Sequence, residues 1–303
     1  MELKIFATPP RFPFMALDAL RPADAIVCAV CGQHASSVLD VENIETQVWW
    51  ANYVLPYGHA VCFPCFLALS TREQNKLMVE HWMHMAGVPL LETGARFDNF
   101  EHTRSTDVLY NPVWAWYSDN RANSTFLALL SSQKGIGKTR LAISAMAEYF
   151  VDNAGINLRM RNGLFAPYVT NKTFLFLKER DLSMRLRSTY DNTSEYGEHD
   201  VLKELNAVDF LVLDDLLSNK NSDFDRQIFL TILDHRMDAA GKLTIFTSNH
   251  TLAEIDKLDA RISSRLRDVH KGLVLTVEKS KIPDYRATKT NADGGVESNV
   301  IAL

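Results

Sequence analysis

The sequence is poor in cysteine, in net charge and in long hydrophobic runs. Its 303 residues include only four cysteines, and the formal net charge at neutral pH is −5. No apolar run approaches the roughly 18 residues that a membrane-spanning helix needs, so no membrane partner is expected. The first 30 residues lack a basic start followed by a long apolar core, which predicts no secretory signal and a soluble, cytoplasmic protein.

The small net charge limits how the chain can bind nucleic acid. Its 32 basic residues are outnumbered by 37 acidic ones, so affinity for nucleic acid must come from local basic clusters rather than from a global field. The hydrophobic share of 47% and the charged share of 23% are ordinary for a globular protein. The length then predicts one or two domains.

All the cysteines lie near the start of the chain. They form two CxxC pairs, which are Cys28 with Cys31 and Cys62 with Cys65. A reducing cytoplasm disfavours stable disulfides, and two such pairs supply the four soft ligands that Zn²⁺ prefers. We therefore expect a structural zinc site, in which His34 or His59 could take the place of one cysteine. A redox motif or unbound buried thiols are the alternatives.

Residues 1–94 are expected to form a separate zinc-binding domain that docks a partner. Two β-prone segments, 46–54 and 59–62, flank a Pro-Tyr-Gly turn, and the second CxxC pair leads into a helix. A further helix is predicted from Ser70 until Gly87 stops it. This order is typical of a treble-clef-like module, which is too small to stay folded on its core alone, so the metal would stabilise it.

Residues 95–287 alternate between short apolar runs and helical patterns. Strands are expected at 126–130, 173–177, 209–213, 243–247 and 273–277. Helical stretches separate them at 139–150, 179–190, 225–241 and 253–268. Continuous apolar strands separated by helices indicate an α/β domain, with a parallel sheet covered on both faces. The tail, residues 288–303, is polar and is expected to be mobile.

The sequence SSQKGIGKT, which follows the first of these strands, predicts a phosphate-binding loop. Backbone N–H groups at a helix start attract the negative charge of phosphates, and the glycines let the backbone approach them. Lys138 is expected to reach the β- and γ-phosphates, and the Thr139 hydroxyl to help hold Mg²⁺. The nucleotide-binding residues expected here are Ser132, Gly135, Ile136, Gly137, Lys138, Thr139 and Arg140.

One position departs from the phosphate-loop pattern G-x-x-x-x-G-K-[ST]. Ser132 stands where the pattern has glycine, and a small residue is expected to be tolerated at the entrance of the loop. The alternative is a surface turn rich in glycine and lysine that matches the pattern by chance. Its position between a strand and a helix favours the nucleotide loop.

Polar residues follow two later strands. Asp214 is expected to hold the water shell of Mg²⁺, and Asp215 to polarise the attacking water. An aspartate is a shorter base than the glutamate of many ATPases, so slow turnover is expected. Asn249 is expected to orient the water beside the γ-phosphate, with helix capping as the alternative role. In isolation, the paired aspartates would be taken for a solvated turn.

The segment 260–268, ARISSRLRD, concentrates Arg261, Arg265 and Arg267. An arginine delivered to the γ-phosphate of a neighbouring copy stabilises the charge that spreads in the transition state. A solvated helix face is the alternative for such a cluster. The order of the motifs favours the catalytic role.

Five blocks in this order, RFDNF, QKGIGKT, FLVLDDL, IFTSN and RISSRLRD, resemble the AAA+ ATPases of the DnaC/DnaI family of replicative helicase loaders. The resemblance covers roughly residues 95–287 and implies a P-loop domain whose five-stranded parallel sheet has the order 5-1-4-3-2, without a C-terminal helical lid. It makes Arg265 the arginine finger, Arg261 its neighbour, and Arg286 a further group at the phosphates. Ser132, Asp215 and the zinc module depart from the family pattern.

The resemblance implies an ATP-dependent loader of a hexameric helicase onto single-stranded DNA during replication, encoded by a bacterium or a phage. ATP or ADP, Mg²⁺ and Zn²⁺ are the expected cofactors, and copies would associate through their arginine fingers. The helix after the second strand would contact DNA. Its expected DNA-binding residues are Lys178, Arg180, Arg185 and Arg187, with Tyr190 as a stacking face, and a solvated amphipathic helix is the alternative.

Three other functions fit the same motifs. The first is a transposition ATPase of the IstB kind, which shares the ATPase core but serves a transposase. The second is a DNA-binding adaptor with a vestigial phosphate loop. The third is a small-molecule kinase, in which Asn249 and the RISSRL segment would have no purpose. The zinc-type module favours the helicase loader.

Overall fold

The computed structural model describes residues 70–103, 106–120, 126–161, 164–169, 172–189, 197–217, 223–239, 241–268, 272–277, 288–290 and 296–298. The four cysteines, Tyr190 and Arg286 lie outside these residues, so the zinc site, the stacking face and the late arginine stay predictions. The chain divides into two compact units. One is Met1–Trp82 with Phe150–Lys172, and the other is Met83–Tyr149 with Thr173–Leu303. The predicted domain boundaries stay a prediction.

The described part of the first unit holds a hairpin that was not expected from the sequence. β2 (Ile156–Arg161) and β3 (Leu164–Val169) pair in antiparallel fashion, from Ile156 opposite Val169 to Arg161 opposite Leu164. The two residues between the strands are Asn-Gly in the sequence, the pair most typical of a tight hairpin turn.

A buried asparagine connects two helices in this unit. α4 (Thr71–Met85) begins one residue after the predicted Ser70, and α6 (Lys138–Asn153) ends here. Asn75 Nδ2 donates to the carbonyls of Phe150, Val151 and Ala154 at 3.3, 2.9 and 2.7 Å. The last carbonyls of a helix have no partner within it, so one amide satisfies the C-terminal end of α6.

The second unit contains the parallel sheet. Its strands are β1 (Phe126–Leu130), β4 (Phe174–Lys178), β5 (Phe210–Leu216), β6 (Leu243–Ser248) and β7 (Gly272–Thr276). They lie in the order β4-β5-β6-β1-β7, and every neighbouring pair is parallel. All five predicted strands are present, and the predicted order 5-1-4-3-2 is confirmed.

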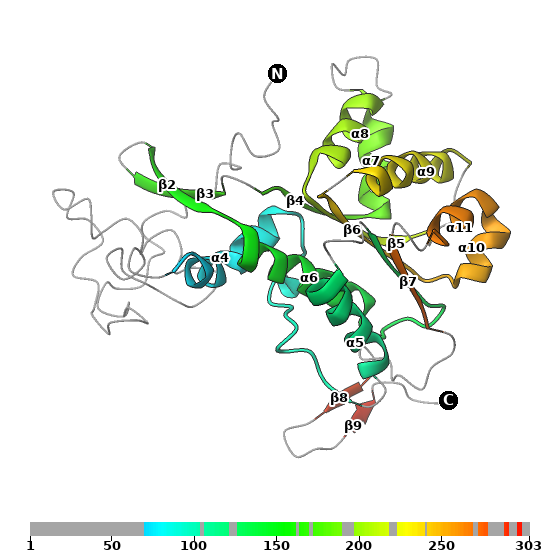
Figure 1. Ribbon diagram of the computed structural model, residues 1–303, viewed down its shortest axis with the longest axis horizontal. Coiled ribbons are helices and arrows are strands. Elements are labelled where there is room, and N and C mark those ends of the chain that lie inside the picture. Colours follow the sequence, from blue (N-terminus) through cyan, green and yellow to red (C-terminus); the bar gives the residue numbers. More distant parts are fainter. Residues whose placement is uncertain are drawn as a thin grey trace. The chain divides into compact units, whose positions relative to one another are not determined.

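Helices cover this sheet on both faces, as Figure 1 shows for α6 on one side and α8 and α9 on the other. The helices of the second unit besides α6 are α5 (Asp107–Ala115), α7 (Glu179–Ser188), α8 (Glu198–Ala207), α9 (Asp223–Asp238), α10 (Leu252–Leu258) and α11 (Ala260–Leu266). Two shorter turns, a 3-10 helix at Leu90–Glu92 and a π-helix at Trp116–Asn120, flank α5 in sequence. Neither α5 nor α8 was expected.

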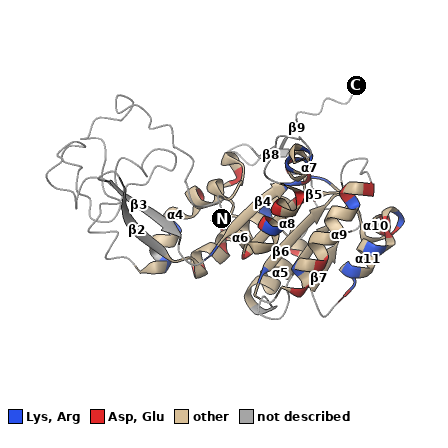
Figure 2. Ribbon diagram, turned by 90° about the horizontal axis from the view of Figure 1, so that it is seen from above, with Lys and Arg blue, Asp and Glu red and all other residues tan. Residues whose placement is uncertain are grey.

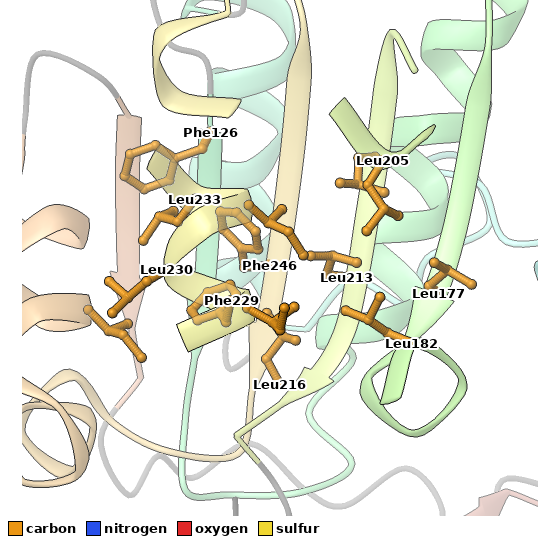
Figure 3. Close-up of a cluster of buried hydrophobic side chains, with 14 of the residues drawn as sticks. Phe126, Leu177, Leu182, Leu205, Leu213, Leu216, Phe229, Leu230, Leu233 and Phe246 are labelled. Atoms are coloured by element: carbon orange, nitrogen blue, oxygen red, sulfur yellow. The ribbon is translucent and has the colours of Figure 1, made fainter. Parts of the chain in front are cut away.

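The side chains of each strand alternate between the two faces. One face supplies Phe126, Leu213 and Phe246 to a core cluster that also contains residues of α7 to α11 (Figure 3). On the other face, Tyr149 of α6 contacts the ring of Phe210 with centroids 5.2 Å apart. Because apolar side chains leave both faces, the strands carry the continuous apolar runs that the sequence shows.

The prediction of one helical stretch over 253–268 was wrong. The chain leaves the helical conformation at Asp259, which has φ −160° and ψ 106°. Its carboxylate accepts a hydrogen bond from the N–H of Arg261 at 2.9 Å, so it caps the second of two short helices. The periodic apolar pattern runs on across this break, which is why the sequence suggested a single helix.

The described part of the C-terminal tail contains a short hairpin, in a segment that was expected to be mobile. β8 (Thr288–Thr290) pairs with β9 (Val296–Ser298) in antiparallel fashion. Separately, none of the helices in the described ranges combines the length and the apolar character that crossing a membrane requires.

Candidate nucleotide-binding site

The loop that joins β1 to α6 turns through two glycines with left-handed backbone. Gly135 has φ 73° and Gly137 has φ 92°, and residues with a Cβ rarely adopt such values. At Gly137 an added Cβ would also lie 3.1 Å from two ring carbons of Phe100, so this ring packs directly against the loop. Since α6 begins at Lys138, the N–H groups of its first turn point to the space that an anion would occupy.

Lys138 lies almost fully buried at the start of α6, with 6% of its surface exposed. Its Nζ donates to the carbonyl oxygens of Ser131 at 3.3 Å and Gln133 at 3.0 Å, and to Oδ1 of Asn249 at 3.0 Å. These three acceptors are neutral. They hold the ammonium group at the loop where the phosphates of a nucleotide would enter.

Asp214 is 1% exposed and is the centre of two hydroxyl contacts. Its Oδ1 accepts from Thr139 Oγ1 at 2.8 Å and from Thr247 Oγ1 at 2.6 Å. Burial raises the pKa of Asp214; the two hydroxyl groups oppose this shift, Asp215 adds to it, and Lys178 opposes it. Adjacent hydroxyl and carboxylate oxygens are the hard ligands that Mg²⁺ takes beside water and phosphate. Thr139 and Asp214 therefore fit a magnesium ion.

A β-bulge in β5 brings the second aspartate to the site. Leu213 lies opposite Phe246, whereas Leu216 lies opposite Ser248, so β5 has one more residue than β6 over this interval. The strand thus continues past its predicted end. An extra residue bends the strand and redirects a side chain, and Asp215 lines the cavity described below.

The backbone at the bulge is strained, and hydrogen bonds hold it. Asp215 has φ 58° and Leu217 has φ 61°, and such values cost about 1–3 kcal/mol each in residues other than glycine. The N–H of Asp215 donates to Thr247 Oγ1 at 2.9 Å, and its Oδ1 accepts from Asn249 Nδ2 at 3.0 Å. Asn249 therefore connects Asp215 to Lys138 through one amide, because its oxygen accepts from the lysine.

A cavity of about 510 Å³ opens beside these groups. The glycine loop, the start of α6, Asp215 and Asn249 form its polar side, and Leu91, Ala95 and Phe100 contribute apolar surface from the segment before α5. Pockets of roughly 300–1,000 Å³ hold ligands the size of a nucleotide. The cavity thus offers a charged side for phosphates and an apolar side for a base.

The part of the site that precedes α5 was missed by the sequence analysis. Asn99 and Phe100 belong to the RFDNF block, which contributed to the family resemblance but was given no role in the site. The Nη2 atom of Arg140 donates to the Asn99 carbonyl at 3.0 Å and to Asn99 Oδ1 at 2.7 Å. This contact joins the segment before α5 to the helix that begins at Lys138. The RFDNF block was visible in the sequence, but the sequence does not show that Phe100 packs against Gly137 or that Asn99 bonds to Arg140.

The serine that departs from the glycine pattern is exposed and does not line the cavity. Ser132 lies next to Ser131, which is fully buried. Ser131 Oγ donates to the Val277 carbonyl at 2.7 Å and accepts from the Gln133 N–H at 3.1 Å. The entrance of the loop is thus shaped by the buried serine. Ile136 is buried and lines the cavity.

The two predicted finger arginines do not line the cavity of their own chain. Arg265 Nε is paired with Asp234. Arg261 donates to both carboxylate oxygens of Asp259, at 3.0 and 2.7 Å, and to Gln227 Oε1 at 3.3 Å. These pairings raise the pKa of both arginines, so both stay charged. Figure 2 shows the basic residues of α10 and α11.

The four predicted DNA-binding residues lie in different settings. Lys178 is the last residue of β4 and lies opposite Asp214, and its positive charge acts to lower the pKa of that carboxyl group. Arg185 Nη1 donates to Glu204 Oε1 at 3.2 Å. Arg180 and Arg187 are exposed on α7, as is Arg185. The structure therefore separates Lys178, beside the nucleotide site, from the exposed arginines of the helix.

Comparison with known proteins assigns the domain to a family. Residues 91–276, more than half of the chain, match the bacterial DnaA ATPase domain. The chain belongs to this AAA+ ATPase family. The match begins at Leu91, the residue from which the apolar side of the cavity starts.

Curated relatives of this DnaA-family chain include replicative helicase loaders. DnaC of Buchnera aphidicola subsp. Acyrthosiphon pisum is 23% identical over 216 residues, which are 71% of this chain and 79% of the relative. DnaC of the subspecies Baizongia pistaciae is 23% identical over 167 residues, which are 54% of this chain and 60% of the relative.

Two solved structures match this chain over part of its length. AMPPCP-bound DnaA from Aquifex aeolicus has a TM-score of 0.47 and 16% identity, and the match covers 61% of this chain and 50% of DnaA. A crystal structure of the DnaC helicase loader has a TM-score of 0.45 and 22% identity, with 62% of this chain and 99% of that one covered. This chain thus spans half the length of the DnaA structure.

Proposed function

We propose that this DnaA-family protein is an ATP-dependent loader of a replicative hexameric helicase onto single-stranded DNA. The observation that carries the ATPase part is the convergence of Lys138, Asp215 and Asn249 at one cavity. Asp214 lies behind them and accepts a hydrogen bond from Thr139, which also lines the cavity. Relatives named as helicase loaders support the choice of partner. Copies would assemble through arginines, and the N-terminal zinc-type module would dock the helicase.

The glycine loop and five side chains of the site have roles in this proposal. The N–H groups of the loop and the ammonium group of Lys138 bind the β- and γ-phosphates. Thr139 and Asp214 would hold Mg²⁺, which when bound neutralises phosphate charge. Asp215 accepts a proton from the attacking water, and Asn249 orients that water through its amide. A carboxylate that the bulge directs into the cavity can serve as this base.

The arginine finger is proposed to act between copies. Neither Arg261 nor Arg265 lines the cavity of its own chain, so a role at the γ-phosphate requires that they reach the cavity of a second copy. Arg265 would then exchange Asp234 for the phosphate. Because Asp234 is about half exposed, this exchange breaks an ion pair that contributes little to stability. Arg286 is proposed as a further side chain that contacts the phosphates.

The proposed DNA contact lies on α7. Arg180, Arg185 and Arg187 are all exposed on this helix, but Arg185 is paired with Glu204. The charges of Arg180 and Arg187 would therefore bind the phosphates of single-stranded DNA. Replacing both by serine should weaken DNA binding and flatten its dependence on salt concentration. Replacing Arg185, which is engaged with Glu204, should have a smaller effect. Equal effects of the two changes would contradict this assignment.

A binding experiment tests the choice of partner. The full chain is immobilised with ATP and Mg²⁺ and exposed to purified hexameric replicative helicase, with the Lys138→Ala chain as the matched control. Retention by the wild type and not by the control supports the loader. A second arm exposes the chain to a purified transposase, and its retention in place of the helicase would favour the IstB-like alternative. ATP turnover that vanishes in Lys138→Ala would exclude the adaptor with a vestigial loop.

A further inference from the structure

The backbone of Asp215–Leu217 is held by side chains at four of its polar groups. The Asp215 N–H donates to Thr247 Oγ1 at 2.9 Å, and the Leu216 carbonyl accepts from Ser248 Oγ at 2.6 Å. The Leu217 N–H donates to Glu179 Oε1 at 3.1 Å, and the Leu217 carbonyl accepts from His250 Nε2 at 2.7 Å. Because a carbonyl only accepts, His250 carries its proton on Nε2 in this contact.

Glu179 differs from the other three groups in its origin and in its charge. Thr247, Ser248 and His250 come from the end of β6 and the residues directly after it, whereas Glu179 is the first residue of α7. It is only 7% exposed, and burying a carboxylate is costly unless it is hydrogen-bonded. Glu179 and the Leu217 N–H that it binds are 38 residues apart in the sequence.

The N–H that Glu179 holds belongs to a residue in a strained conformation. Leu217 and Asp215 both have positive φ, 61° and 58°, and such conformations persist only where the surroundings over-determine them. Without the contacts at Leu217, the chain after the bulge is free to relax toward ordinary strand geometry. Relaxation there would rotate Asp215 away from the cavity.

We propose that Glu179, together with His250, is a positioning residue that keeps Asp215 directed at the nucleotide. Neither residue lines the cavity, so each acts through Leu217. The inference rests on the proposed ATPase function, since Asp215 matters there as the base. It predicts that loss of Glu179 lowers the rate of hydrolysis while leaving the binding of ATP intact, because Lys138 and the glycine loop are untouched.

The test compares Glu179→Ala and Glu179→Gln with Asp209→Ala as the matched control. Glutamine keeps the Oε1 acceptor for Leu217. Asp209 also accepts a hydrogen bond from a backbone N–H, that of Thr173 at 2.9 Å. This contact joins β4 to β5 as well, but at the end of the strands that lies opposite the site. For each chain, ATP affinity, the single-turnover hydrolysis rate, the free energy of unfolding and amide exchange at Leu217 are measured.

Glu179→Ala should lower the hydrolysis rate roughly tenfold or more, as the loss of one charged hydrogen bond would, with ATP affinity within about twofold of wild type. Glu179→Gln should restore most of the rate. Exchange at the Leu217 amide should rise in Glu179→Ala and stay unchanged in Asp209→Ala. Asp209→Ala should lose stability but keep its rate per folded molecule.

A folded Glu179→Ala chain with the wild-type rate, or a parallel fall in rate in Asp209→Ala, would overturn the proposal. If Glu179→Ala does not fold, His250→Ala provides the second variant, since this side chain is 31% exposed and should tolerate truncation. It too must slow hydrolysis and speed exchange at the Leu217 amide. A wild type without turnover would end the ATPase proposal instead, and the exchange measurement would still decide whether Glu179 holds Leu217.

Discussion

Two buried cations in the same unit are used in different ways. Arg236 in α9 is 1% exposed and donates to Thr244 Oγ1 at 2.8 Å and to the carbonyls of Leu205, Val208 and Leu243 at 3.3, 2.5 and 2.7 Å. Lys138 is also held by neutral oxygens, but it lies in the wall of the cavity. Arg236 therefore connects segments of the fold, whereas Lys138 faces the cavity in which a ligand would bind.

The difference follows from geometry rather than from burial. A guanidinium has five N–H donors in a fixed plane, and Arg236 uses them to satisfy carbonyls at the end of α8 and the start of β6. Burial lowers its pKa to about 10, which still leaves it charged at neutral pH. An ammonium group has a compact charge on a flexible stem, and an arriving phosphate can replace its carbonyl partners. The arginine therefore stabilises the fold, and the lysine serves the site.

The largest effect is expected where the cation is structural. Arg236→Ala leaves the carbonyls of Leu205, Val208 and Leu243 buried without this donor, so the free energy of unfolding should fall by about 3–5 kcal/mol. Denaturant unfolding of the ATP-free protein measures this change. The ATP affinity of the molecules that remain folded should equal that of the wild type. Weaker ATP binding in the folded fraction would break the distinction between the two cations.

Lys138→Ala should give the opposite pattern. The free energy of unfolding should fall by only about 1–2 kcal/mol, because water from the cavity can replace the ammonium group at its three acceptors. ATP affinity should fall at least about 100-fold, which corresponds to roughly 2.7 kcal/mol. Calorimetric titration with ATP and Mg²⁺ measures the affinity, and the unfolding curve serves as the control. A variant that binds ATP normally but unfolds easily would make Lys138 a second structural cation.

A smaller effect is expected from the glycine that shapes the loop. Gly137→Ala combines left-handed backbone with the contact to Phe100, so it should lower the free energy of unfolding by about 1–2 kcal/mol and weaken ATP binding. Gly241→Ala is the matched control, because Gly241 also has positive φ, 76°, but has no atom within 4 Å of an added Cβ. The control should lose stability without losing affinity for ATP. Equal ATP affinities in the two variants would argue against a role of the loop.

The smallest effect concerns Asp214 and pH. Its folded pKa is raised by burial, so the folded protein binds more protons than the unfolded chain between the ordinary carboxyl pKa and the raised one. This contribution to stability therefore falls as pH rises through that window. Asp214→Asn should remove this part of the pH dependence in the absence of Mg²⁺ and nucleotide. Unfolding curves over the carboxyl range compare the two chains, and identical slopes would contradict the assignment.

The strands of the sheet could be predicted because β1, β4, β5 and β6 are buried along most of their length. β7 is only partly buried, but its sequence is equally apolar. Segments such as 126–130 and 209–213 are apolar at nearly every position, and this pattern indicates a covered parallel sheet. The hairpin of β2 and β3 lacks such continuity, although Asn162-Gly163 is a turn signal that was present. α8 was missed because only Val201 and Leu205 of this short, polar helix are buried.

The site was predicted in part for a similar reason. Lys138, Asp214 and Asn249 follow strands of one parallel sheet, so the order of motifs along the chain brings them to one edge. Asn99 and Phe100 escaped notice because their partners lie across the fold, and no local pattern marks them. The separation of Lys178 from the exposed arginines of α7 depends likewise on which strand lies beside β4.

By itself, the sequence determined the glycines of the loop, the lysine that follows them and the apolar runs that become the sheet, because each depends on neighbours along the chain. Only the tertiary structure decided the bulge that turns Asp215 into the cavity, since a register belongs to two strands and not to one. It also decided which buried cation stabilises the fold. The surroundings of Arg236 and Lys138 come from distant segments, and packing alone brings those segments together.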